Sequence, residues 1–478
     1  MTRPTPSLVR GLGALAATAI VVCEVIGTGV FLKARVMTCN VETPVLVISV
    51  WILAGLLSLA GALTYAELSA MMPRAGGEYV FIREAYGRMP GFLFGWMRFF
   101  IGNGGGLAAL ATGLAIFLNV LAGGALSAWD LYVPAGRAGI LRVDGVQLFA
   151  AGVLLVVAAI NCAAVAVSGR VASALTLLKV LLVLAIGGSA MWAAGGHLSI
   201  FEGSGASGTC EGVAASARGG IAGFGAAMIA AMWAYNGWNE LTYVAGEVRD
   251  PGRNLPRALV GGIAIVATLY VFVNASYFRV LTAAEIASVA PQSAVAAEVL
   301  IRLFGAAATG LMAATLSMSV FSALLVASLV SARVPFAMAE DGLFFAALAK
   351  VSPRTRVPVR ALIVQSLWAI VLVVSGSFDT LTDYAMFAIL LFVGMATASI
   401  FVLRRRWPLA ARPYRTWGYP VVPALVLAML AWLLVNTLIT APGQALAGLG
   451  LIAVGLPFYW YWSRRAKAPT VTVEAEGA

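Results

Sequence analysis

Long apolar stretches recur along almost the whole chain, and each is long enough to cross a lipid bilayer as a helix. The 478-residue sequence is 61% hydrophobic and 11% charged, with a mean hydropathy of +0.95, which excludes an ordinary soluble domain. We therefore expect an all-α integral membrane protein. Runs of roughly twenty apolar residues predict about twelve spans, at residues 13–33, 45–70, 91–121, 146–166, 170–194, 219–244, 257–280, 304–334, 357–376, 380–403, 420–440 and 444–463.

Two of these spans are interrupted by glycine, at roughly corresponding places in two halves of the chain. The first break lies at residues 26–29 and the second at residues 234–238. Backbone that leaves the helix inside a membrane is tolerated only where protein or a water-filled cavity satisfies it, and paired broken spans are typical of transporter substrate sites. The pattern predicts two inverted five-helix repeats, residues 13–194 and 219–403, with a cavity between the breaks.

The connections between spans predict how the chain is threaded through the membrane. Lys and Arg gather in alternate connections, with an imbalance of about three to one that places both termini in the cytoplasm. Residues 1–12 and 464–478 form polar tails, residues 404–463 form two additional spans, and residues 72–87 predict a short amphipathic helix at the inner surface. The net charge of +11 thus reflects the positive residues of the cytoplasmic connections. We expect a plasma (inner) membrane protein without a nucleic-acid partner.

The backbone chemistry of the two breaks suits a zwitterion. The N–H groups that follow Gly29 have no intrahelical acceptor and lie at a positive dipole end, which favours a carboxylate, and the Thr28 hydroxyl adds a donor. The carbonyl groups before Asn236 end a half-helix and form a negative pole that favours an ammonium group. Since an α-amino acid carries both groups, we expect such a substrate. Trp233 is the first candidate for a side chain that gates the cavity, and Tyr235 and Trp238 are weaker candidates.

Three charged side chains inside predicted spans indicate function. Lys179 stands alone among apolar residues, where a buried cation costs about 3 kcal/mol, so a functional role is the default and snorkelling to an interface is the alternative. Glu24, one turn before the first break, leaves three alternatives open: an ion pair with Arg98, carriage of a proton, or contact with a cationic substrate. Glu240 has similar options.

Sequence motifs in a fixed order cover nearly the whole chain. They are Val25-Ile26-Gly27-Thr28-Gly29-Val30-Phe31, then Tyr65-Ala66-Glu67-Leu68 with Pro73-Arg74-Ala75-Gly76-Gly77-Glu78-Tyr79, then residues 233–239, residues 247–257, and Arg412-Pro413-Tyr414-Arg415 with Gly418-Tyr419-Pro420. Together they resemble the amino acid–polyamine–organocation superfamily, and within it the L-type amino acid transporter branch.

This resemblance implies the LeuT fold, with two extra helices, and alternating access around a site between the first and sixth helices. It assigns the carboxylate of the substrate to Ile26, Gly27, Thr28 and Gly29, and its amino group to carbonyls in the break that contains Trp233, Ala234, Tyr235, Asn236 and Gly237. It also implies that Lys179 replaces the sodium ion of sodium-coupled relatives and joins helix one to helix eight, where Ser319 and Ser322 share a face. The family commonly has a gating phenylalanine at the position of Trp233.

We expect sodium-independent transport of neutral L-amino acids, by exchange or with proton coupling. A carrier of cationic amino acids or polyamines is one alternative, and an amino acid sensor or receptor that does not transport is another. An enzyme is not expected, because no nucleophile–base pair appears in the spans. No cofactor is expected, nor a metal site, because His197 is the only histidine and no cluster has ligand spacing.

The four cysteines bear on partners. Cys39 and Cys210 fall in two predicted outward loops, and whether they form a disulfide stays open. Eukaryotic L-type relatives attach to a glycoprotein through a cysteine between the third and fourth spans, and residues 122–145 contain none. No disulfide-linked heavy subunit is therefore expected, so the partners are an amino acid, the lipid bilayer and, if transport is proton-coupled, protons.

Overall fold

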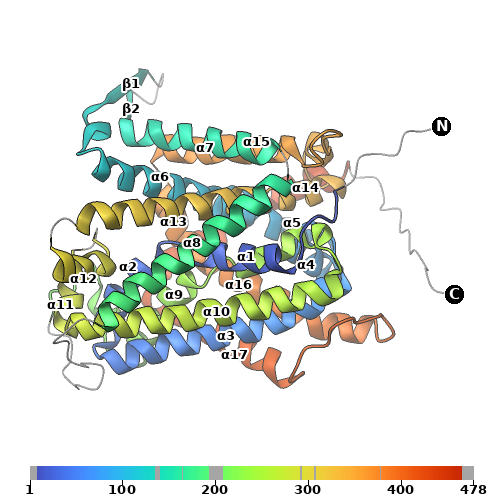
Figure 1. Cartoon of the computed structure of the whole chain (residues 1–478). Coiled ribbons are helices and arrows are strands. Elements are labelled where there is room, and N and C mark those ends of the chain that lie inside the picture. Colours follow the sequence, from blue (N-terminus) through green and yellow to red (C-terminus); the bar gives the residue numbers. More distant parts are fainter. Residues whose placement is uncertain are drawn as a thin grey trace.

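A computed structural model describes residues 8–134, 140–163, 165–192, 208–290, 293–305, 308–376 and 378–465. Its helices run roughly side by side through a single bundle (Figure 1). In the described part, nine helices are long and apolar enough to cross a membrane, or ten when one bent pair counts as a span. The expected all-α membrane class is confirmed, whereas the count of about twelve spans stays a prediction. The predicted polar tails lie mostly outside the described residues.

Helices fill most of the chain. Those of the first half are α1 (Ala14–Val25), α2 (Gly29–Val41), α3 (Pro44–Met71), α4 (Glu78–Tyr86), α5 (Arg88–Met97), the π-helix η1 (Arg98–Asn103), α6 (Gly104–Leu121), η2 (Ala125–Ala128), α7 (Gly145–Ala163) and α8 (Val165–Met191). Those of the second half are η5 (Ala215–Ala217), α9 (Gly220–Ala234), η6 (Trp238–Glu247), α10 (Pro251–Val280), α11 (Ala283–Ser288), α12 (Val295–Phe304), α13 (Ala308–Ser331), α14 (Arg333–Glu340), η7 (Ala346–Ala349), α15 (Val359–Ser375), α16 (Phe378–Arg406), α17 (Val421–Thr440), α18 (Pro442–Ala453) and α19 (Gly455–Ser463).

The predicted helix breaks both form. Helix α1 ends at Val25 and α2 begins at Gly29, with a bend of 43° between the two. Helix α9 ends at Ala234 and the 3-10 helix η6 begins at Trp238. Gly237 has a φ angle of +113°, a backbone conformation that side-chain-bearing residues rarely adopt. Glycine is therefore required where the second helix changes direction.

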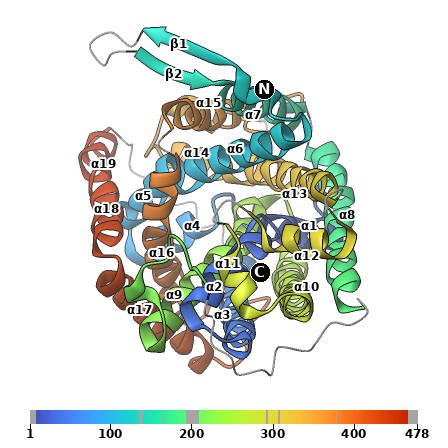
Figure 2. The same cartoon turned by 90° about the vertical axis from the view of Figure 1, so that its left-hand side faces the viewer.

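The first broken helix lies in the middle of the bundle. Helix α1 is contacted by α8, α10, α13 and η6, so it is surrounded by helices from both halves of the chain (Figure 2). Helix α2 packs mainly against α9, the corresponding segment of the second broken helix. The two breaks are thereby brought together in the interior.

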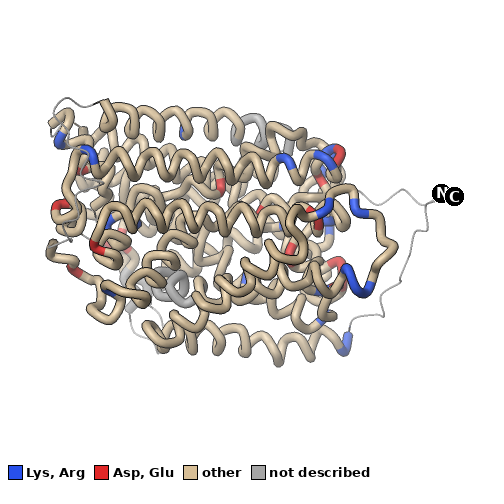
Figure 3. The backbone as a smooth tube through the Cα atoms, turned by 90° about the horizontal axis from the view of Figure 1, so that it is seen from below, with Lys and Arg blue, Asp and Glu red and all other residues tan. Residues whose placement is uncertain are grey.

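The two ends of the bundle differ in charge. Lys and Arg gather at one end, which we call the arginine-rich end; it carries Arg404, Arg405 and Arg406 at the last turn of α16 (Figure 3). The opposite end carries a hairpin of β1 (Asp130–Pro134) and β2 (Ile140–Asp144), paired antiparallel. We did not expect this hairpin, which is the one departure from helix among the named elements of the described chain.

A disulfide closes this second end, which we call the disulfide end. Cys39 and Cys210 are bonded and both are buried, so the pairing that the sequence left open is formed. Asn40 adds two hydrogen bonds beside it: its carbonyl accepts from the Gly219 N–H at 2.7 Å, and its side-chain amide donates to the Ala217 carbonyl at 2.6 Å. The end of α2 is thus tied to the segment that precedes α9.

The short helix predicted at the inner surface forms as α4, but it does not lie on the surface. Six of its nine residues are buried, among them Glu78, Tyr79 and Phe81. The surrounding ends of α16 and α5 cover it. The prediction of the helix is confirmed, and its position at the inner membrane surface stays a prediction. Its burial shows that an amphipathic pattern does not tell a lipid-facing helix from one covered by protein.

Candidate functional site

The first break presents free backbone donors. The Gly27 N–H donates to the Val25 carbonyl at 2.8 Å, which turns the chain out of α1. Among the described residues, no acceptor is recorded for the N–H groups of Thr28, Gly29 and Val30. These donors stand at the N-terminus of α2, where the helix dipole adds positive potential. The break is therefore suited to bind a carboxylate.

The second break presents carbonyl groups. The Asn236 N–H donates to the Trp233 carbonyl at 3.2 Å and closes a turn after α9. The carbonyl of Ala234 has left the helix, and a carbonyl oxygen has two lone pairs. The end of α9 is also the negative end of its dipole. A small ammonium group is the chemical complement of this segment.

One side chain that sequence reasoning missed joins the two breaks. The Tyr270 hydroxyl, on α10, lies 2.7 Å from the Val25 carbonyl oxygen and 3.0 Å from the Ala234 carbonyl oxygen. It is buried against Trp51 and Tyr235. Nothing in the sequence distinguishes Tyr270 from other tyrosines in apolar spans, so only the fold identifies its role.

The two breaks also touch directly. A Cβ added to Gly29 would lie 2.7 Å from both Cα and Cβ of Ala234, a distance that real Cβ atoms do not reach. A Cβ added to Gly237 would lie 3.1 Å from Cβ of Glu24 and 3.2 Å from its carbonyl oxygen. Glycine at both positions lets the two unwound segments approach one another.

Lys179 lies at the carbonyl end of α1. It is buried on α8, and its ammonium donates to the carbonyls of Ile26 at 2.6 Å and Cys23 at 3.1 Å. The residues expected to support it are arranged differently: the Ser322 hydroxyl donates to the Ser319 carbonyl at 2.8 Å, and the buried Ser319 hydroxyl has no hydrogen-bond partner among the residues that the structure describes. Since no bond between Lys179 and either serine occurs in the described chain, the link to helix eight stays a prediction.

The buried acids have different partners. Glu240, on η6, forms an ion pair with Arg98 at the start of the π-helix η1. The alternative in which Glu24 forms an ion pair with Arg98 is therefore wrong. Its Oε1 atom is buried and, within the described residues, has no hydrogen-bond partner. The geometry leaves Glu24 available for a proton or a cation.

Of the three aromatic residues at the second break, Trp233 contacts the other broken helix, and its role as a gate stays a prediction. The Lys33 ammonium, on α2, lies 4.5 Å from the centroid of its ring, a cation–π contact that joins the two half-helices. Tyr235 is buried and its hydroxyl donates to the Trp51 carbonyl at 3.1 Å. Trp238 packs edge-on against Tyr65, with ring centroids 4.9 Å apart. The last two residues are thus held in packed aromatic clusters.

A second buried carboxylate supports η6 from the side. Glu78 on α4 accepts from the Tyr65 hydroxyl at 2.6 Å, the Asn239 amide at 2.7 Å and the Tyr243 hydroxyl at 2.9 Å. Sequence analysis gave Glu78 no role, although it belongs to one of the quoted motifs. No group of three or more His, Cys, Asp or Glu in the described part of the chain could hold a metal ion.

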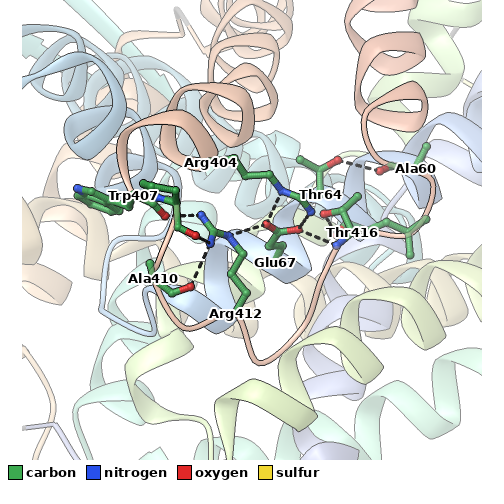
Figure 4. A network of polar contacts seen from close by, with 10 residues as sticks. Ala60, Thr64, Glu67, Arg404, Trp407, Ala410, Arg412 and Thr416 are labelled. Carbon is green, nitrogen blue, oxygen red and sulfur yellow. Dashed lines mark hydrogen bonds and ion pairs between the residues drawn. The ribbon is translucent and has the colours of Figure 1, made fainter. Parts of the chain in front are cut away.

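Ion pairs hold the arginine-rich end. Glu67 on α3 accepts from Arg404 through both oxygens, at 2.6 and 2.9 Å, and Arg412 lies 3.3 Å from the same carboxylate (Figure 4). Glu247, at the end of η6, pairs through both oxygens with Arg333 at 2.8 and 3.0 Å, and both side chains are buried. These contacts lie far from the disulfide and fix the other ends of the helices.

Comparison with known proteins gives consistent matches over nearly the whole chain. A family described as amino acid permease matches residues 12–458. The serine/threonine exchanger SteT of Bacillus subtilis is 29% identical over 460 residues, which cover 96% of this chain and 98% of that protein. The human b(0,+)-type amino acid transporter 1 is 28% identical over 476 residues, covering 97% and 92%. The human large neutral amino acids transporter small subunit 2 is 29% identical over 469 residues, covering 96% and 82%.

Proposed function

Because this chain belongs to the amino acid permease family, we propose that it carries neutral L-amino acids across the plasma membrane, without sodium, by alternating access between two inverted repeats. It is a multi-pass membrane transporter and not an enzyme. The observation that carries the proposal is the direct contact of the two helix breaks at Gly29 and Ala234, with free N–H groups on one side and the carbonyls that end α9 on the other.

In this proposal each pole of the substrate has its own break. The carboxylate binds the N–H groups of Thr28, Gly29 and Val30 in the segment that begins at Ile26 and Gly27. The amino group binds carbonyls of the segment from Trp233 to Tyr235, which Asn236 and Gly237 hold open. Tyr270 positions both carbonyl ends. The variable side chain then lies toward Trp233, whose size limits bulk.

Sodium independence follows from Lys179. Its ammonium already satisfies the carbonyls of Cys23 and Ile26. A sodium ion there would have to compete with a fixed positive charge in a buried site, which electrostatic repulsion disfavours. Lys179 thus acts as a built-in cation for the end of α1.

We propose exchange as the mode of transport, since one relative that matches 96% of this chain is named a serine/threonine exchanger. The buried, unpartnered oxygen of Glu24 favours a second candidate, in which Glu24 carries a proton with the substrate or receives the charge of a cationic substrate. Glu240 is the weaker candidate because Arg98 neutralises it.

The proposed orientation puts the arginine-rich end and both termini in the cytoplasm, as the positive-inside rule requires. The disulfide end then faces an oxidising exterior, which suits the Cys39–Cys210 bond. Those two cysteines bind each other, and Cys23 and Cys162 lie within helices. We therefore propose that the chain works without a disulfide-linked heavy subunit, although one relative is named a small subunit.

Uptake into sodium-free proteoliposomes tests these proposals. Radiolabelled L-alanine is offered outside vesicles that are empty or loaded with unlabelled amino acid, at equal and at acidic outside pH. Uptake only into loaded vesicles supports exchange. Uptake into empty vesicles driven by outside acid, and lost in Glu24→Gln, supports proton coupling instead. Strong competition by arginine over alanine would replace the neutral substrate with a cationic one, and binding without uptake would indicate a receptor.

A further inference from the structure

An apolar groove runs along the outside of the bundle between α3, α9 and α17. Its volume is about 1000 Å³, and none of its lining residues belongs to either helix break. The residues that define it include Leu56, Ala60, Phe224, Leu425, Met429 and Trp432. We call it the α3–α17 groove.

The groove follows the membrane depth. On α3 its lining extends from Leu46 to Ala60, which corresponds to about 21 Å at the rise of an α-helix. At the disulfide end it reaches Ile221, in the first turn of α9. At the other end it reaches Val422, in the first turn of α17. This length and its apolar walls fit an acyl chain.

The loop before α17 leads into the lining residue Val422 at the arginine-rich end of the groove, which we call its mouth. The Thr416 hydroxyl donates to the Leu63 carbonyl at 3.2 Å, within one helical turn of Ala60 (Figure 4). This bond places the neighbouring Arg415 and Trp417, both exposed, beside the mouth; the Trp417 side chain is 75% exposed. Arginine and tryptophan next to an apolar surface are typical of the region where lipid headgroups lie.

The mouth also carries excess positive charge. Arg404 and Arg412 share the single carboxylate of Glu67. Arg415, three residues after Arg412 in the same loop, adds a further positive charge. Two guanidiniums on one carboxylate, with Arg415 next in the loop, leave an excess of positive charge there. A basic pocket between membrane helices at this depth favours an anionic headgroup.

We propose that one anionic phospholipid of the cytoplasmic leaflet occupies the α3–α17 groove, with its phosphate at Arg415 and one acyl chain along the groove to Phe224. The choice of leaflet rests on the orientation given under the proposed function. Because Phe224 and Ile221 belong to α9, the lipid contacts the half-helix that leads into the second break.

Thermal unfolding of the purified full-length protein in detergent tests the headgroup. Dioleoyl phosphatidylglycerol and dioleoyl phosphatidylcholine have the same chains and differ in charge. The anionic lipid is expected to raise the unfolding midpoint by roughly 2–4 °C more than the neutral lipid. Arg415→Gln removes this difference, whereas Arg464→Gln, an exposed arginine at the end of α19, keeps it. Equal shifts for the two lipids, or a difference that Arg415→Gln does not change, overturn the proposal.

A second pair of variants tests the groove. Ala428→Phe fills it and is expected to lower the number of phosphatidylglycerol molecules retained in native mass spectrometry from one to none. Ala431→Phe, also exposed on α17 but outside the lining, is expected to retain the lipid. A lipid-free dimer of the wild type would show that a second copy covers the groove and would refute the lipid proposal. Retention of phosphatidylglycerol by both variants would also refute it. Neither readout requires transport, so an inactive protein that retains the lipid refutes the proposed function alone.

Discussion

The two broken helices are joined to each other at both ends of the molecule, but by bonds of different kinds. At the disulfide end, a covalent bond between Cys39 and Cys210 ties α2 to the segment before α9. At the arginine-rich end, Leu12 pairs with the end of η6 through two backbone hydrogen bonds, to Glu247 at 3.0 Å and from Arg249 at 2.8 Å. The first connection is permanent under oxidising conditions, and the second can open and reform.

This difference indicates which parts move together. Since the disulfide ties α2 to the segment before α9 and α2 packs along α9, we expect the two half-helices to move as one unit. Helix α1 and η6 form the corresponding unit at the arginine-rich end, held by noncovalent contacts. The two units meet at the glycine contact between Gly29 and Ala234. In the proposed mechanism, alternating access consists of motion of these units about the breaks.

The largest effect is expected at the arginine-rich end, in the buried pair of Glu247 and Arg333. Arg333→Met leaves the Glu247 carboxylate buried without its partner, which costs about 3–5 kcal/mol of the free energy of unfolding. Denaturant unfolding in detergent measures this loss. Arg302→Ala, which removes an exposed ion pair with Glu285, is the matched control and changes stability by less than about 1 kcal/mol. Equal losses of unfolding free energy in the two variants would contradict the larger contribution expected from the buried pair.

Breaking the disulfide weakens the other unit. Cys39→Ser removes a cross-link over 171 residues and is expected to cost about 2–4 kcal/mol. The same loss should follow complete reduction of the wild type, and transport should fall because α2 and α9 no longer move together. Cys162→Ser, at a free cysteine, is the control and should behave like the wild type. Full transport by a reduced protein would show that the two half-helices do not need the bond.

The junction between the units tests whether they must touch. Gly29→Ala adds a Cβ 2.7 Å from Ala234, and overpacking of this kind costs about 1–3 kcal/mol. Uptake in proteoliposomes is expected to fall at least roughly tenfold, because the backbone donors beside Gly29 shift with the clash. The control Gly106→Ala, in α6, places its Cβ in open space and should leave uptake unchanged. Normal uptake by the Gly29 variant would show that transport does not depend on the close contact between the two breaks.

The sequence predicted the parts of this arrangement that depend on local chemistry. Glycine and asparagine in apolar spans located both breaks, and an isolated charge among apolar residues identified Lys179, which indeed contacts the end of α1. The LeuT fold and the boundaries of the two repeats stay predictions. The contacts that these residues make with distant segments were harder to predict.

Contacts between distant segments were not predictable from the sequence. Arg98 has two acidic candidates, Glu24 and Glu240, and only the packing of η1 against its neighbours decides that it pairs with Glu240, 142 residues away. Tyr270 bridges the two breaks from a helix whose sequence shows no special pattern. Such pairings depend on the orientation of helices that are far apart in the chain, which hydrophobic periodicity does not encode.

The smallest effect is expected at the rim of the disulfide end, where Glu285 caps α11. The Thr282 backbone N–H donates to its carboxylate at 2.8 Å, as does Arg302, and these bonds hold the pKa of Glu285 below its ordinary value. A carboxyl group whose folded pKa is depressed adds stability above the pKa of the unfolded chain, about 4.3. That contribution is lost as the pH falls through the folded pKa.

Glu285→Gln is therefore expected to lower stability by less than about 1 kcal/mol near neutral pH, since both side chains of the ion pair are largely exposed. The difference from the wild type should shrink as the pH falls through the folded pKa of Glu285, because the wild-type carboxyl is then also protonated. Unfolding midpoints measured from neutral to acidic pH follow this change. Glu298→Gln, with the same change of charge on α12, controls for net charge. A difference that stays constant with pH would assign the stabilisation to the shape of the cap and not to its charge.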